Sequence, residues 1–112
     1  MFNDQNHVTS MANHKPVIKA VIFDKKGRIL SEAENSYTKT HPYQKRLAEK
    51  SKNPHRIYLH AEIAALVRCR GTPYKISITR TNAKGELVLA KPCDICELAI
   101  KEAGIKIVEF SI

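Results

Sequence analysis

Two stretches decide the fold, residues 60–71, HAEIAALVRCRG, and residues 92–104, PCDICELAIKEAG. In each stretch apolar residues recur at helical spacing after a polar start, and a glycine, Gly71 or Gly104, follows the last of them. Pro92 also suits the beginning of a helix, because its φ is preset and the first helical turn does not use its missing N–H. The stretches therefore predict two helices that begin at residues able to bind a metal.

Three side chains at these helix starts are typical zinc ligands. Zinc takes histidine nitrogen and cysteine thiolate, and a catalytic site keeps three protein ligands so that water can hold the fourth position. His60, Cys93 and Cys96 supply such a set. Two cysteines three residues apart lie on one side of a helical turn, where unpaired N–H groups favour the thiolate. The pattern predicts a catalytic Zn2+ site.

Glu62 stands two residues after His60 and is not needed as a ligand. Zinc lowers the pKa of bound water from near 16 to about 7, and the released proton needs an acceptor. We expect Glu62 to take this proton, pass it to a ring nitrogen and later protonate a departing amine. Attack at C4 of cytosine or C6 of adenine would then give a carbonyl and ammonia. Glu62 is the predicted catalytic residue.

A closed structural zinc site, or no metal at all, is the alternative interpretation of the same residues. A closed site needs a fourth ligand, and the candidates are His41, His55 and Cys69. None of them has the close spacing of a zinc finger or ribbon. A coincidental occurrence of His-x-Glu and Pro-Cys-x-x-Cys at two helix starts is less plausible than a shared metal site. The sequence therefore favours the catalytic site.

Length and composition indicate one small globular domain. The chain has 112 residues, of which 43% are hydrophobic, enough for a single modest core. No apolar run reaches membrane-spanning length and residues 1–15 lack the apolar centre of a secretory signal, so we expect no membrane partner and a cytoplasmic, intracellular location. With two of three cysteines assigned to zinc, Cys69 is left unpaired, which argues against a disulfide framework. We expect residues 1–15 to form a flexible N-terminal tail and residues 16–112 a single folded domain.

The charge balance points to a phosphate-bearing partner. Nineteen Lys and Arg against eleven Asp and Glu give a net charge of +8, which favours a nucleotide or a single-stranded nucleic acid over a neutral ligand. The alternative is a basic surface that is only solvated. Residues 42–56 form the most basic portion, read either as a phosphate-contacting flap or as a solvated helix face. Its candidate phosphate contacts are Lys45, Arg46, Lys52 and Arg56.

The remaining segments alternate between strand and helix patterns. The near-continuous apolar character of residues 17–23, VIKAVIF, predicts a central strand covered on both faces. Alternation and turn residues predict further strands, and Pro42 can open another helix. The sequence thus predicts an α/β fold with a mixed sheet. The expected elements are a hairpin of residues 17–24 with a strand from residue 28, a helix over 42–50, strands over 74–81, 87–90 and 105–110, and the two helices above.

The segment His60-Ala61-Glu62 with Pro92-Cys93-x-x-Cys96 resembles the cytidine deaminase-like superfamily. The likeness is to the branch with His-Ala-Glu, which includes deoxycytidylate, tRNA adenosine and polynucleotide cytidine deaminases, and it extends over about residues 17–110. The resemblance implies a three-layer α/β/α sandwich with a mixed central sheet, zinc on the histidine and both cysteines, and the glutamate as proton shuttle. Residues 16–112 would then be a single zinc-dependent deaminase domain.

The resemblance also implies substrate contacts and an assembly. Asn35, at the end of an expected strand, is similar to the family's substrate-contacting asparagine, and Ala61 is carried over as a second contact. Lys91 stands where the tRNA enzymes usually carry glutamate, and a hairpin at residues 82–86 precedes Pro92. The compactness is similar to that of small deaminase-like proteins of phage genomes. Relatives commonly form pairs or larger assemblies, which implies a homo-oligomer.

Three functions remain open from the sequence. The leading one is a zinc-dependent hydrolytic deaminase that converts the cytosine base of a nucleotide, of the dCMP or CMP type, to uracil with release of ammonia. The second keeps this chemistry but acts on cytosine or adenine in single-stranded DNA or RNA. The third, least favoured, is a non-catalytic binding module that zinc stabilises.

Overall fold

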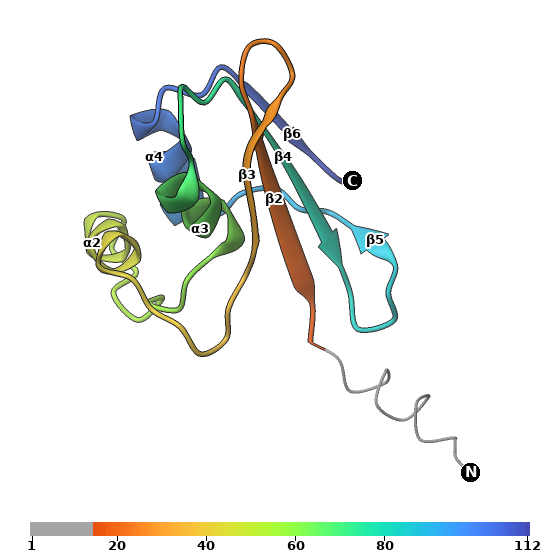
Figure 1. Cartoon of the computed structure of the whole chain (residues 1–112). Coiled ribbons are helices and arrows are strands. Elements are labelled where there is room, and N and C mark those ends of the chain that lie inside the picture. Colours follow the sequence, from red (N-terminus) through yellow and green to blue (C-terminus); the bar gives the residue numbers. More distant parts are fainter. Residues whose placement is uncertain (1–14) are drawn as a thin grey trace.

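The computed structural model describes residues 15–112, so the expected tail, residues 1–15, lies outside the described residues apart from Lys15. Figure 1 shows the arrangement of the described elements. In chain order they are β2 (Val17–Phe23), β3 (Ile29–Glu34), α2 (Pro42–Lys50), α3 (Ala61–Arg68), β4 (Lys75–Thr81), β5 (Leu87–Val88), α4 (Asp94–Glu102) and β6 (Ile107–Phe110).

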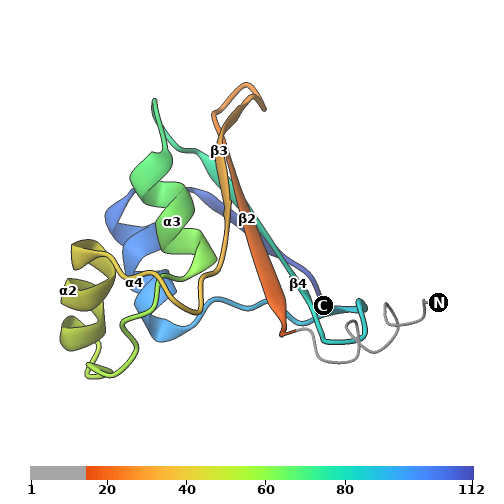
Figure 2. The ribbon, with the colours of Figure 1, turned by 60° about the horizontal axis from the view of Figure 1, so that its bottom comes forward.

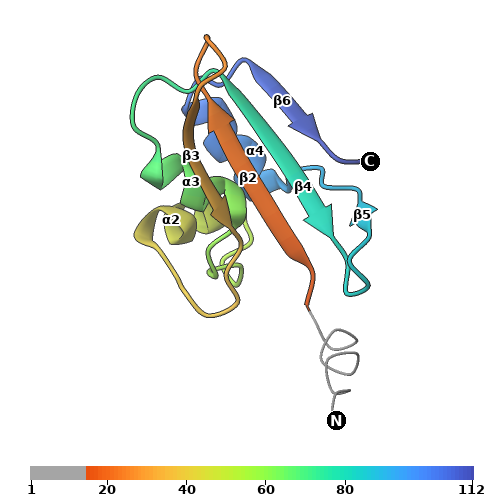
Figure 3. The same ribbon diagram turned by 45° about the vertical axis from the view of Figure 1, so that its right-hand side comes forward.

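The sheet is mixed, as predicted. β2 lies between β3 and β4 and is antiparallel to both, so the strand expected at the centre is central (Figure 3). Two short strands share the other side of β4. β6 runs parallel to β4 along Lys75–Ile78, whereas β5 pairs antiparallel with Arg80 and Thr81. The parallel strand follows α4, as expected of a strand that returns through a helical crossover.

All three described helices lie on the same side of the sheet, as Figure 2 shows. Ala20 and Ile22 of β2 are paired with Ile78 and Ile76 of β4, and these four residues are fully buried beneath the helices. On the opposite face Lys19 is exposed, because strand side chains alternate between faces. The predicted α/β class is confirmed. Residues 15–112 supply two layers, the sheet and one layer of helices, and no helix among these residues covers the opposite face of β2.

Most predicted boundaries agree with the structure, and the differences lie at element ends. The helix expected over residues 42–50 is α2. The helix after His60 ends at Arg68, before Gly71, because Cys69 already has an extended conformation with φ −66° and ψ 130°. β5 covers only two of the four residues expected over 87–90, and β6 begins at Ile107 rather than at residue 105.

Helix α2 is joined to α4 by both apolar and polar contacts. Leu47 and Ala48 on the inner face of α2 are fully buried. At the rim, Tyr43 Oη and Lys50 Nζ each donate a hydrogen bond to the Glu102 carboxylate at 3.0 Å. Residues 15–112 contain no helix that is both long and apolar enough to cross a membrane.

Candidate metal centre and active site

The two predicted helix starts meet, and they bring the three predicted ligands together. His60 is the N-cap of α3, Cys93 is the N-cap of α4, and Cys96 lies in the first turn of α4. The Nδ1 atom of His60 is 3.2 Å from the Cys96 sulfur and 3.5 Å from the Cys93 sulfur. All three donor atoms lie within 4.8 Å of one another, a spacing at which one metal ion can contact them all.

The electrostatics of this cluster suit a metal that prefers thiolate and neutral imidazole. The hydrogen bond from the Cys96 thiol lowers the pKa of Cys93 to about 3, so this side chain is a thiolate at neutral pH. The same hydrogen bond, together with burial, raises the pKa of Cys96. The hydrogen bond to Cys93 raises the pKa of His60. The donor set therefore fits zinc, whose binding would replace these protons.

The fourth coordination position has no protein ligand among the residues that the structure describes. Of the histidine, cysteine and acidic groups in residues 15–112, only His60, Cys93 and Cys96 form such a cluster. His41 instead caps α2, where its Nδ1 accepts a hydrogen bond from the Tyr43 N–H at 3.0 Å. Cys69 is the C-cap at the opposite end of α3 from the cluster. This geometry supports the open site and argues against the closed one.

Glu62 lies in the first turn of α3, beside the cluster. Its side chain is almost completely buried, and its Oε1 has no hydrogen-bond partner in the described chain. Burial raises the pKa of the carboxyl group above its ordinary value. Buried polar atoms are nearly always paired, so an unpaired carboxylate oxygen indicates a group that a ligand or water completes. Glu62, His60 and Cys93 line one pocket with a volume of about 190 Å³.

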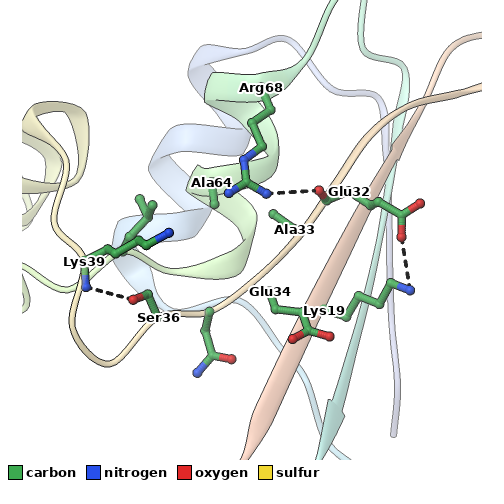
Figure 4. Close-up of a pocket in the computed structure, with 10 residues that line it drawn as sticks. Lys19, Glu32, Ala33, Glu34, Ser36, Lys39, Ala64 and Arg68 are labelled. Carbon is green, nitrogen blue, oxygen red and sulfur yellow. Dashed lines mark hydrogen bonds and ion pairs between the residues drawn. The ribbon is translucent and has the colours of Figure 1, made fainter.

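The predicted substrate contacts have different surroundings. Asn35 follows β3, and its Oδ1 accepts a hydrogen bond from the Ile18 N–H at 2.9 Å, while Ile18 lines the pocket of Glu62. Asn35 itself lines a neighbouring cleft of about 450 Å³ between β3 and α3, seen in Figure 4 with Ala64 and Arg68 on its α3 side. Ala61 is fully buried and does not line the pocket. Both contacts stay predictions.

The four predicted phosphate contacts lie on or after α2, and none of them lines the pocket. Lys45 is exposed on α2, and Lys52 follows the helix with φ +64°. Arg46 stacks on Tyr43, with its guanidinium 4.8 Å from the ring centroid, and lies 4.0 Å from Glu102. The positive charge of Arg56 works to lower the pKa of His60, against the larger raising effect of the Cys93 hydrogen bond.

Three residues of this site were not among the predicted site residues. Gln44 of α2 is fully buried, and its Oε1 accepts a hydrogen bond from the His60 N–H at 3.1 Å while its Nε2 donates to the Arg56 carbonyl at 3.0 Å. A glutamine at helical spacing from Leu47 and Ala48 is the signal that could have found it. Arg80 and Lys91 both line the pocket.

Comparison with known proteins supports the metal assignment. The sequence of residues 4–112 matches the family model described as the cytidine and deoxycytidylate deaminase zinc-binding region. No curated protein matches the chain closely enough to count as a relative. The matched region contains His60, Cys93, Cys96 and Glu62, and the clustered donor atoms are those of a zinc site. The cofactor is therefore Zn2+, as the sequence predicted.

Proposed function

This chain belongs to the family of the cytidine and deoxycytidylate deaminase zinc-binding region, and from that premise we propose that it deaminates the cytosine base of a nucleotide of the dCMP or CMP type. The observation that carries the proposal is the buried Glu62 carboxylate, which has an unpaired oxygen and shares a small pocket with two of the three zinc-ligand residues. The reaction consumes one water and yields the corresponding uracil nucleotide and ammonia. We expect the reaction to take place inside the cell.

Glu62 is suited to moving protons in both directions. A general acid–base group works best when its pKa lies near the operating pH, and burial moves the pKa of this carboxyl group upward from its ordinary value. As a carboxylate, Glu62 takes a proton from the attacking water and delivers it to N3 of the ring. It then carries the second proton to the amino group at C4, and the C4–N4 bond breaks as ammonia leaves. The residue ends the cycle in the form in which it began.

The remaining site residues hold the metal and shape the pocket. His60 Nδ1 and the sulfurs of Cys93 and Cys96 would hold Zn2+. The chemistry that zinc supplies when bound is to lower the pKa of water from near 16 to about 7. Gln44 fixes the backbone of His60, so α2 supports the metal centre without contacting it. The pocket volume of about 190 Å³ is below the 300–1,000 Å³ typical of drug-sized ligands, which favours a small substrate over a large one.

The alternative substrate, a base in single-stranded DNA or RNA, has less support from the structure. It needs a basic track along which the backbone phosphates lie. Arg46 of the predicted flap is instead engaged with Tyr43 and Glu102, in contacts that hold α2 against α4. The non-catalytic module is opposed by the open coordination position and by the unpaired oxygen of Glu62.

A substrate panel tests the proposal. Zinc-loaded protein is incubated with cytidine, dCMP, CMP, adenosine and single-stranded oligonucleotides, and ammonia release is followed beside Glu62→Ala and a control, Glu49→Ala. Glu49 is exposed on α2, so its removal takes away the same charge without touching the pocket. We expect turnover of a cytosine nucleotide that falls by a factor of about 10² to 10⁴ in Glu62→Ala alone. Turnover of oligonucleotides only, or of no substrate at all, would overturn the proposal.

A further inference from the structure

The pocket of Glu62 is also lined by basic side chains that the deamination chemistry does not use. His60, Glu62 and Cys93 are among its lining residues. Arg80 and Lys91 also line it, so two basic side chains share a space of about 190 Å³ with the buried side chain of Glu62. A cytosine ring offers these side chains no negatively charged partner. We therefore look for that partner in the rest of the substrate.

The fold directs Arg80 into this pocket through the strand alternation of β4. Ile76 and Ile78 are fully buried toward the helices, and Arg80 lies two residues further on the same face. Unlike these two isoleucines, Arg80 is exposed, and it lines the pocket. Its backbone N–H donates a hydrogen bond to Ser111 Oγ at 3.2 Å.

Ser111 fixes the segment that carries Lys91 as well. The Ala90 N–H donates to the Ser111 carbonyl at 2.9 Å, one residue before Lys91. Ser111 Oγ also donates to the Val88 carbonyl at 2.6 Å, and the Ser111 N–H donates to the Ile78 carbonyl at 3.0 Å. One residue near the end of β6 therefore holds β4 and the segment before Pro92 together. The two cations are brought to the pocket by separate elements with a common anchor.

Neither cation has an ionic partner in the described chain. The basic residues of the sheet and helices that are paired there include Lys19 with Glu32, Lys50 with Glu102 and Lys75 with Glu109. No ion pair within residues 15–112 involves Arg80 or Lys91. An arginine beside a lysine is a typical arrangement for binding phosphate, because the guanidinium donates two parallel hydrogen bonds and the ammonium adds a point charge.

We propose that Arg80 and Lys91 bind the phosphate monoester of the nucleotide while its base lies against Glu62. The inference rests on the proposed function and names the part of the substrate that the protein selects. Because both cations line one small pocket, the geometry favours a single terminal phosphate over a chain of phosphates. The basic residues around the β2–β3 turn, such as Lys26, line a different pocket that contains no zinc-site residue.

Kinetics with two substrates tests the assignment. Arg80→Gln, Lys91→Gln and the double variant are compared with Lys106→Gln, which removes one positive charge from an exposed residue outside the pocket. For dCMP we expect kcat/KM to fall about tenfold in each single variant and further in the double variant, mainly through KM. For deoxycytidine, which lacks the phosphate, we expect less than about a twofold change, since neither side chain contacts the base.

Equilibrium dialysis separates this proposal from the deaminase proposal. Zinc-loaded Glu62→Ala protein, with and without Arg80→Gln, is dialysed against radiolabelled dCMP and deoxycytidine. Preferential binding of dCMP that Arg80→Gln removes would support the phosphate site even if no substrate is turned over, in which case the deaminase proposal alone fails. Equal losses for both substrates, or unchanged dCMP affinity and kinetics in the double variant, would overturn the phosphate site while leaving the deaminase proposal intact.

Discussion

Two regions of the molecule are rich in charged side chains: the α2–α4 seam, formed by Tyr43, Arg46, Lys50 and Glu102, and the pocket beside the starts of α3 and α4. Their charges are arranged differently. In the seam, the Glu102 carboxylate accepts hydrogen bonds from Tyr43 and Lys50 and lies 4.0 Å from Arg46. In the pocket, Glu62 Oε1 has no partner within the described residues. Charges that satisfy one another contribute to stability, whereas charges left without partners are available for a ligand. The contacts between α2 and α4 therefore serve the fold, whereas the pocket is the region with groups free to meet a ligand.

The largest expected effect comes from removing a zinc ligand. Cys96→Ala takes away a fully buried donor atom of the three-residue cluster. We expect loss of bound zinc and of all deaminase activity, because two protein ligands do not make a stable zinc site. Metal analysis after gel filtration, together with ammonia release, provides the measurement. Cys69→Ala is the matched control and should retain zinc; equal zinc content in both variants would contradict the assignment.

Asn35→Asp tests the amide at the border of the pocket. The aspartate can still accept the hydrogen bond from the Ile18 N–H, so the melting temperature should change little. The Nδ2 donor is lost, and we expect kcat/KM for a cytosine nucleotide to fall by a factor of about 10 to 100. Unchanged kinetics in a folded variant would remove Asn35 from the list of substrate contacts.

Gln44→Leu removes the side chain through which α2 contacts the backbone of the zinc ligand His60. The substitution leaves the His60 N–H and the Arg56 carbonyl without their buried partner. An unsatisfied buried group costs about 1–3 kcal/mol, so we expect the free energy of unfolding to fall by about this amount and zinc to bind more weakly. Urea denaturation and competition with a chelator measure the two effects. The neighbouring exposed Lys45→Leu is the control, and an equal loss of zinc affinity there would show that Gln44 has no special role.

Glu102→Gln should have the smallest effect. Hydrogen bonds from Lys50 and Tyr43 hold the pKa of Glu102 below its usual value. Since the folded pKa is below the unfolded one, the carboxylate contributes stability above the usual pKa of glutamate, and this contribution is lost as the pH falls through the lowered value. We expect a slightly lower melting temperature than wild type at pH 7, a difference that vanishes in acid, and unchanged deaminase kinetics. A marked loss of activity would show that the seam also serves the site.

What the sequence could predict was local. His60, Glu62, Cys93 and Cys96 stand within two short motifs at helix starts, and one metal ion explains their spacing, so the cluster could be expected before the fold was known. The hairpins, α2 and α4 also follow from nearest-neighbour patterns.

What the sequence could not predict depended on packing between distant elements. Arg46, a predicted phosphate contact, has Glu102 of α4 at 4.0 Å, a neighbour that the sequence alone does not show. Arg80 and Lys91 reach one pocket only because Ser111 joins β4 to the segment before Pro92. The alternation of Ile76 and Ile78 already places Arg80 on the helix side of the sheet, but the sequence of β4 does not show that Arg80 is exposed and lines a pocket.

Zinc removal and reconstitution tests the central claim most directly. Wild-type protein is stripped with a chelator, reloaded with increasing zinc, and assayed for uracil nucleotide and ammonia from dCMP at each step. We predict no turnover without metal, and activity that rises until one zinc is bound per chain, with equal amounts of the two products. Protein that holds one zinc per chain and forms no uracil nucleotide from dCMP or CMP would contradict the account.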